Sequence, residues 1–146
     1  MVEFAFAAVP FMTTIFISLA IVVHTLEQEV AVNAAARGAR EAVLASETNL
    51  DCADYDRAAI VADQTLGGAL FGTKVSLQGS GALGADGCNQ PKPCPPTQVA
   101  HVEICFMVDG ARNITVAVKG EPAGLIPGWI WPLDEEATGH LAAFQP

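Results

Sequence analysis

Residues 4–23 have the sequence FAFAAVPFMTTIFISLAIVV, a run of twenty residues without one charged side chain. A helix of that length rises about 30 Å, which is the thickness of the hydrocarbon core of a bilayer. No basic residue precedes the run, and no small-residue cleavage pattern closes it, because a helical pattern continues through His24 and Glu27. We therefore expect a membrane-spanning helix that stays in the working protein.

The helical pattern extends well beyond this apolar run. Residues 26–44 are rich in Ala, Glu, Val, Arg and Leu, which are good or acceptable helix formers. From Leu26 to Ala42, apolar and small residues recur at intervals of three and four, with charges opposite. Pro10 lacks a backbone N–H and predicts a kink or a loosened turn. The pattern as a whole predicts one helix over residues 3–46.

A second, shorter helix is predicted after a polar break. One face of its pattern carries four apolar residues, Tyr55, Ala59, Ala62 and Leu66. Gly67 and Gly68 then end the pattern, and a helix this short should lie on a sheet. The sequence thus divides into an N-terminal helix, residues 1–48, and a head, residues 49–146.

The head also carries the alternating pattern of β-strands. Apolar residues alternate with polar ones over 74–78 and 102–108, and again over 114–118. The dipeptide Asp109-Gly110 between the last two runs is a strong turn signal, so they form a hairpin. A last short strand is expected over 137–144. The predicted class is α+β, with a long N-terminal apolar helix and a head of one short helix packed on a three- to four-stranded antiparallel sheet.

The charge balance argues against nucleic acid as a partner. The formal net charge is −9, and the seven basic residues are scattered, whereas phosphate contacts need clustered Lys and Arg. From residue 51 onward the chain has eleven acidic and five basic residues, so the head carries about −6. This charge favours a soluble, solvent-facing head.

Cysteine usage predicts an oxidising compartment. Cys52, Cys88, Cys94 and Cys105 all follow the apolar run, and an even number on the exported side of a membrane helix predicts two disulfides. Two pairings stay open: Cys88–Cys94 with Cys52–Cys105, or Cys52–Cys88 with Cys94–Cys105. No Cys-x2-Cys pair is present, so no zinc site is predicted.

No catalytic constellation is visible in the sequence. Its three histidines, including His101, stand in unrelated settings, and catalysis would require the fold to bring His101 together with carboxylates. The acidic run Asp134-Glu135-Glu136 predicts a solvated turn rather than a calcium site, which needs six to eight convergent oxygens. We therefore expect neither an enzyme nor a bound metal or cofactor.

Glu3 is the one charged residue next to the start of the apolar run. An ionised carboxylate is costly to bury in an apolar setting, so it should find a cation. An α-amino terminus, from its own chain or from another copy, is a suitable partner. Alternatively, the carboxylate reaches the membrane surface.

Three stretches together carry a resemblance to a known family. They are VEFAFAAVPF at residues 2–11, NAAARGAREA at residues 33–42 and IPG at residues 126–128. This combination resembles the TadE-like pilins of bacterial tight-adherence pilus systems, which are related to type IV pili. In that family the acidic residue usually stands fifth in the mature chain, whereas Glu3 is third here. Either two residues precede Met1 in the mature protein, or cleavage differs.

The resemblance implies a structural subunit of an extracellular filament that supports adhesion at the cell surface. A prepilin peptidase would process the precursor, and the helix would stay in the cytoplasmic membrane until the pilus assembly machinery moves it into a filament of identical copies. Small residues such as Ala31, Ala34, Ala35 and Gly38 would let backbones of neighbouring copies approach. The residues expected to pack between subunits are Glu3, Phe4, Phe6, Pro10, Phe11, Ile15, Phe16, Leu19 and Val23.

Two other roles fit the same sequence. The chain would then be a monomeric, membrane-anchored binding module whose contact surface is the loop between Cys88 and Cys94, or a minor component of pilus assembly.

Overall fold

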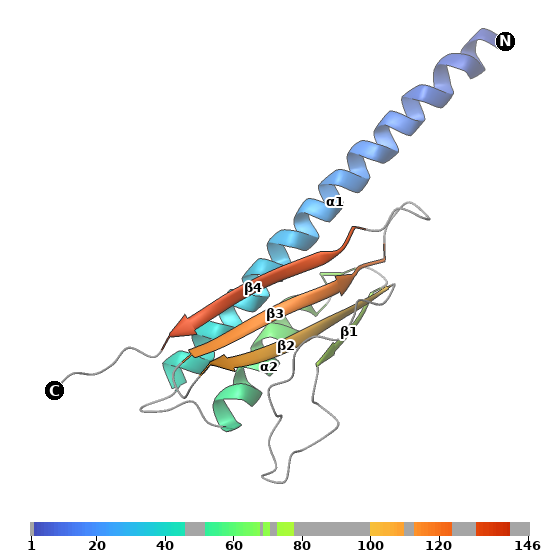
Figure 1. The fold of residues 1–146 in the computed structure, drawn as a ribbon. Helices are drawn as coiled ribbons and strands as arrows, with labels where there is room; N and C mark the ends of the chain where they lie inside the picture. Colours follow the sequence, from blue (N-terminus) through green and yellow to red (C-terminus); the bar gives the residue numbers. More distant parts are fainter. Residues whose placement is uncertain are drawn as a thin grey trace.

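The computed structural model describes residues 2–45, 52–67, 69–70, 73–77, 100–109, 113–123 and 131–140, without the side chains of 2–7, 45, 52–56, 77 and 107–109. Its elements, in chain order, are α1 (Val2–Ala45), α2 (Cys52–Leu66), β1 (Lys74–Leu77), β2 (His101–Asp109), β3 (Asn113–Glu121) and β4 (Leu133–His140). In Figure 1 the N-terminal half of α1 projects from the head, and its C-terminal half lies beside α2 against one face of the sheet. The predicted α+β class is confirmed.

Helix α1 is a single helix of 44 residues, within one residue of the predicted bounds at each end. Pro10 lies inside it without ending it. The hydroxyl groups of Thr13 and Thr14 both donate hydrogen bonds to the Pro10 carbonyl oxygen, each at 2.8 Å. The helix therefore continues through the proline, and Figure 1 shows no sharp bend there.

The four strands form one sheet in the order β1-β2-β3-β4. Strands β2 and β3 form the predicted antiparallel hairpin, and β4 pairs antiparallel with β3. Strand β1, however, pairs parallel with β2, so the prediction of a wholly antiparallel sheet is wrong at this edge. The 23 residues between Leu77 and His101 are long enough for the crossover connection that a parallel pair requires.

Strand β4 begins at Leu133 and ends at His140, earlier than the predicted 137–144. The acidic run that was expected to form a solvated turn therefore lies in a strand. Asp134 and Glu136 point away from the helices and flank Lys119 of β3, whose Nζ lies 2.8 Å from Asp134 Oδ1 and 2.7 Å from Glu136 Oε1. These cross-strand ion pairs make an acidic strand acceptable at this edge.

The hydrophobic core lies between the two helices and one face of the sheet. Helix α1 contributes only small residues to it, whereas β2 and β3 contribute larger ones. Its buried members are Ala31, Ala34, Ala35, Ala39, Ala42, Ala58, Ala59, Ala62, Leu66, Leu70, Val102, Ile104, Phe106, Ile114, Val116, Val118 and Leu133. The core thus joins the C-terminal half of α1 to the head.

Two glycines let the layers of this core approach closely. A Cβ atom on Gly38 of α1 would lie 2.9 Å from the Ala58 carbonyl oxygen in α2, and one on Gly139 of β4 would lie 2.7 Å from the Ala39 carbonyl oxygen. The small residues of α1 are therefore used for packing within the chain. The prediction that Ala31, Ala34, Ala35 and Gly38 bring neighbouring copies together is wrong for this reason.

Candidate assembly surface

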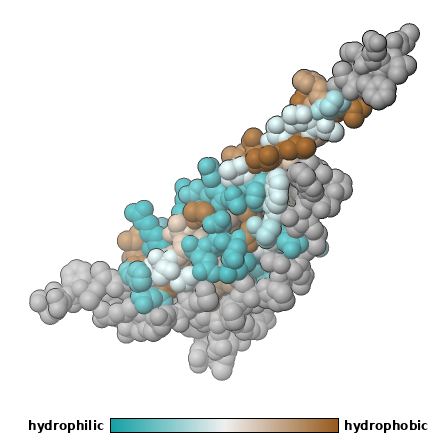
Figure 2. Space-filling model, turned by 45° about the horizontal axis from the view of Figure 1, so that its top comes forward, coloured by the Kyte–Doolittle hydropathy of each residue, from teal (hydrophilic) through white to brown (hydrophobic). Residues whose placement is uncertain are grey.

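The projecting half of α1 carries large apolar side chains that are exposed. Ten of them, between 40% and 65% exposed, are Val9, Phe11, Met12, Ile15, Phe16, Ile17, Leu19, Ile21, Val22 and Leu26. Since they follow one another along the helix, they occupy all its sides rather than one stripe, as in a helix surrounded by an apolar medium. Figure 2 shows the strongly hydrophobic residues gathered on this part, and a mostly hydrophilic head. We call residues 9–26 the apolar stalk.

The predicted packing residues fall into three groups. Phe11, Ile15, Phe16 and Leu19 are exposed in the apolar stalk, as is Pro10, and Val23 is half-buried. Glu3, Phe4 and Phe6 lie in α1, but their side chains are outside the described part of the structure. The prediction omitted Met12, Ile17, Ile21 and Val22, although the same uncharged run contained the signal for them. Leu26, predicted to lie on the packed stripe, is 55% exposed.

The four hydroxyl side chains of the apolar stalk donate hydrogen bonds to carbonyl oxygens within the helix. In addition to the two threonines at Pro10, Ser18 donates to the Thr14 carbonyl oxygen at 2.8 Å and Thr25 donates to the Ile21 carbonyl oxygen at 2.6 Å. A donor left unpaired in a bilayer costs several kcal/mol, roughly, so this arrangement suits lipid or a dry protein interface. Within α1, residues Ala8–Leu44 contain a window long and apolar enough to cross a membrane, with only 6% of it buried in the molecule.

The apolar stalk meets the head at a distinct junction. Here Ala20 and Glu27 are buried, and the ring of His24 contacts that of Trp131, which lies two residues before the start of β4. The ring centroids are 4.7 Å apart and the planes are inclined at 48°. Glu27 is 5% exposed, and in the described part of the chain it has no hydrogen bond or ion pair. Burial raises the pKa of its carboxyl group.

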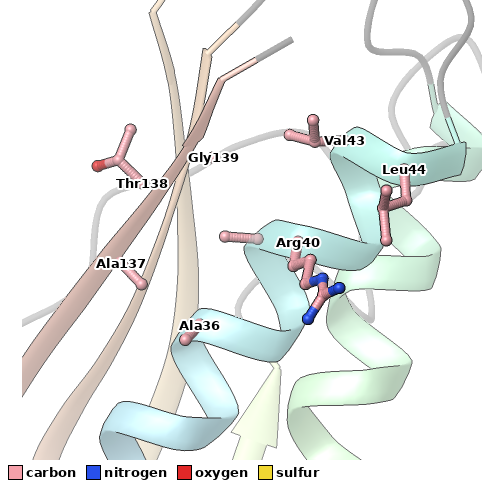
Figure 3. A pocket seen from close by; sticks show the side chains of 8 residues that line it. Ala36, Arg40, Val43, Leu44, Ala137, Thr138 and Gly139 are labelled. Atoms are coloured by element: carbon pink, nitrogen blue, oxygen red, sulfur yellow. The ribbon is translucent and has the colours of Figure 1, made fainter. Parts of the chain in front are cut away.

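A groove lies between the C-terminal end of α1 and the end of β4 (Figure 3). It has a volume of about 280 Å³ and a mainly apolar lining, formed by Ala36, Ala39, Arg40, Val43, Leu44, Ala137, Thr138 and Gly139. In Figure 3, Val43 points toward Gly139, whereas Thr138 points to the opposite side of the strand. No local pattern in the sequence predicts this groove, because it depends on the tertiary contact of α1 with β4.

The edge of the sheet formed by β4 and its neighbours on β3 is polar on the face away from the helices. Besides the Lys119 ion pairs, the hydroxyl groups of Thr115 and Thr138 share a hydrogen bond at 2.8 Å. The hydrogen bond from Lys119 to Asp134 raises the pKa of the lysine most, and the hydrogen bond to Glu136 raises it further. These cross-strand pairs suit a solvent-facing edge, whereas Cys105 and Ala117, on the same face, are buried.

His101 is the histidine for which the sequence left catalysis open, and the fold does bring it next to a carboxylate. Its Nε2 atom lies 2.8 Å from Ser76 Oγ and 3.3 Å from Glu103 Oε1. Both partners use the same ring nitrogen, so the serine and the carboxylate compete for it. In a nucleophile–base–acid relay the carboxylate would instead orient the ring through its other nitrogen. This cluster therefore consists of a cross-strand contact from β1 to His101 and a pairing of His101 with Glu103 on the same face of β2.

Among the cysteines, the structure describes the side chain of Cys105 alone. Cys105 is 1% exposed on the sheet face away from the helices, as the alternation with Ile104 and Phe106 predicted, and it is not a free thiol. The side chains of Cys52, Cys88 and Cys94 lie outside the described residues, so the pairing stays a prediction.

The chain matches no protein-family model, and no curated protein or solved structure is significantly similar to it. Its function is therefore inferred from its own surfaces. Within the described residues, no three His, Cys, Asp or Glu side chains are grouped as metal ligands would be.

Proposed function

We propose that this protein is a structural, non-enzymatic subunit of an extracellular filament of the tight-adherence pilin type, assembled through the apolar stalk. The observation that carries the proposal is the exposure of large apolar residues on every side of the stalk, on the same continuous helix that anchors the head. The resemblance of the first eleven residues and of the Ala-Arg-Gly-Ala-Arg stretch to TadE-like pilins supports the same role.

The physical basis of assembly is an exchange of apolar surroundings. Burial of one large apolar side chain is worth about 1.5–3 kcal/mol, so ten exposed ones cannot stay in water. In the membrane, lipid surrounds them; in a filament, the stalks of other copies do. Because both surroundings are apolar, transfer between them costs little hydrophobic free energy, and side-chain packing decides the balance.

Shearing of surface material tests this proposal. The protein should be recovered from the sheared fraction of intact cells as filaments visible by electron microscopy, with the stalk present in the mass spectrum. The double variant Phe11→Ala, Phe16→Ala keeps the stalk apolar, so it should still insert into the membrane. It loses packing volume and should give at least about tenfold less sheared filament, the equivalent of 1.4 kcal/mol in assembly.

Ile60→Ala is the matched control for that double variant. Ile60 is also a large apolar residue on a helix and is 53% exposed, but it lies on α2 in the head. Its variant should assemble normally. Equal loss of filaments from both variants would show that the stalk has no special role.

Glu3 supplies a second test of assembly. If its carboxylate pairs with an α-amino group at the packed end of the stalk, Glu3→Ala should abolish filaments and leave the membrane-inserted form intact. Glu3→Gln should behave in the same way, because the pairing requires charge rather than shape. Normal filaments from either variant would contradict the pairing.

We also propose that the head is exported and holds two disulfides. Cys105 lies on the outer face of the sheet, whereas α2, which contains Cys52, covers the other face. This placement favours Cys88 or Cys94 over Cys52 as the partner of Cys105. Of the two pairings left open by the sequence, we therefore propose Cys52–Cys88 with Cys94–Cys105. Peptide mapping without reduction should yield Cys105 linked to a peptide from residues 88–94, and a Cys52–Cys105 peptide would contradict this.

The second candidate function is that of a membrane-anchored, monomeric binding module. The groove at Arg40 favours it, since an apolar cleft with a cation at its rim is a common binding geometry. The same shearing experiment separates the two functions, because an anchored monomer stays with the membrane. A minor assembly component would be sheared off in trace amounts with another subunit in excess.

A further inference from the structure

Trp131 lies at the end of the head that faces the apolar stalk. It lies two residues before β4, and the first residue of that strand, Leu133, is in the core. The Trp131 ring is half-buried and contacts His24 of α1, far away in the sequence. The contact therefore places this end of the head beside residue 24 of α1.

Residue 24 also marks the polar end of the apolar stalk. His24 directly follows the uncharged run of residues 4–23, and Glu27 is the first ionisable carboxylate after it. If the run fills the hydrocarbon core, His24 and Trp131 lie at the lipid–water interface. Tryptophan and other rings with one apolar and one polar side are enriched at this depth.

The chain that leads to Trp131 has matching chemistry. Strand β3 ends at Glu121, and the seven residues 124–130 that precede Trp131 are GLIPGWI, with no charged residue. The last described residue before them, Ala123, is held to the same end of the head by a hydrogen bond from its backbone N–H to Thr73 Oγ1 at 2.8 Å.

From this arrangement we infer that, before assembly, the Trp131 end of the head rests on the lipid–water interface of the membrane that α1 spans. The partner is the bilayer surface itself. The inference rests on α1 as a membrane span and on no property of the filament.

The contact has a consequence for Glu27. This residue lies about one turn beyond His24, where the head rather than lipid covers it, and it is 5% exposed. A head seated at the interface keeps the carboxyl group out of the hydrocarbon, where a charge is costly. The core contacts of α1 and the His24–Trp131 contact together place this end of the head at the polar end of the uncharged run.

Depth-dependent fluorescence quenching tests the inference. The chain has two tryptophans, so in the full-length variant Trp129→Phe only Trp131 emits. This variant would be reconstituted into phosphatidylcholine vesicles that contain a spin label either near the ester groups or near the acyl-chain end. We expect the shallow label to quench Trp131 at least about twofold more than the deep label. Absence of lipid quenching, with full quenching by aqueous acrylamide, would overturn the inference, and so would stronger quenching by the deep label.

A second substitution tests the role of His24. His24→Ala in the Trp129→Phe background removes the ring contact and should reduce shallow-label quenching, because the Trp131 ring is no longer held against α1. Unchanged quenching would overturn the positioning role of His24. Vesicles contain no assembly machinery, so failure of filament formation does not affect this result, and a negative result here leaves the filament proposal standing.

Discussion

The two halves of α1 have the same secondary structure and opposite surroundings. In residues 9–26 ten large apolar side chains are exposed, and in residues 31–42 the buried residues are alanines and a glycine. The first half makes few contacts within the chain, whereas the second is a layer of the core, packed on α2 and on β4.

This contrast shows that residue size, and not hydrophobicity alone, separates a stalk from a core helix. Alanines bring α1 close to α2 and the sheet, where larger side chains of β2 and β3 fill the space. Phenylalanine, isoleucine and leucine in the stalk would prevent such an approach, but they provide surface for lipid or for other copies.

The largest expected effect compares one substitution in the two regions. Phe106 is 1% exposed in the core, so Phe106→Ala should lower the free energy of unfolding by about 3–5 kcal/mol. Phe16 is 61% exposed, and Phe16→Ala should change the free energy of unfolding by less than about 0.5 kcal/mol. Denaturant unfolding of the full chain in detergent micelles, followed by circular dichroism, measures both. Equal losses would contradict the division of α1 into stalk and core halves.

Gly38→Ala should have the next largest effect. Alanine at an exposed helix position would stabilise by about 1 kcal/mol, but the added Cβ at Gly38 would lie 2.9 Å from the Ala58 carbonyl oxygen. We expect a net loss of about 1–3 kcal/mol in the same micelle assay. The exposed neighbour Arg37 is the control, since Arg37→Ala touches no packed surface and should be nearly neutral. A stabilised Gly38→Ala variant would show that the helices are less closely packed than described.

Glu27 and Glu29 offer a matched pair for a pH test. Burial raises the pKa of Glu27, so its folded-state value lies above its unfolded value of about 4.5. The contribution of Glu27 to the free energy of unfolding is then most favourable below pH 4.5, and it is lost as the pH rises through the folded-state pKa. Glu27→Gln should therefore stabilise the protein at pH 7 and have little effect at pH 4, whereas Glu29→Gln, at an exposed site, should have little effect at either pH. Thermal unfolding of both variants at pH 4 and pH 7 measures these effects. If Glu27→Gln were destabilised at pH 7, the carboxylate would have a stabilising partner, which would contradict the prediction.

Lys119 should give the smallest effect. It is partly exposed, and its two ion-pair partners are more exposed still, so Lys119→Met should cost about 0.2–1 kcal/mol at neutral pH. Because its folded-state pKa is raised, this contribution is complete below pH 10.5 and disappears as the pH rises through the folded-state value. Unfolding of both proteins from pH 8 to pH 11 would test this. A difference that persists unchanged at pH 11 would mean that packing of the lysine stem, and not charge, is responsible.

Local patterns were sufficient to predict much of the fold. The bounds of α1 follow from helix propensity and the apolar run, and the β2–β3 hairpin follows from alternation around Asp109-Gly110. The parallel direction of β1 was not predictable, since an alternation of four or five residues carries no direction. The early start of β4 was missed because Asp134 and Glu136 disfavour a strand until Lys119 stands beside them.

The candidate site divides in the same way. An uncharged run of twenty residues is visible in the sequence, so the apolar stalk was predictable. The burial of Glu27, the His24–Trp131 contact and the groove at Arg40 each require residues distant in sequence to meet, and no local pattern contains that information. The alanines of α1 were correctly placed on one stripe, but their partner was the head of the same chain rather than another copy.

Photo-crosslinking from the stalk tests the central claim most directly. A benzophenone side chain at position 16, which is exposed and large in the native protein, would be activated in whole cells, and the membrane and sheared fractions would be analysed separately. We predict adducts with lipid in the membrane fraction, and crosslinks from position 16 to the stalk of another copy in the sheared fraction. Lipid adducts alone, with no copy of the chain recovered outside the membrane, would contradict the claim that other copies of the stalk replace lipid around it.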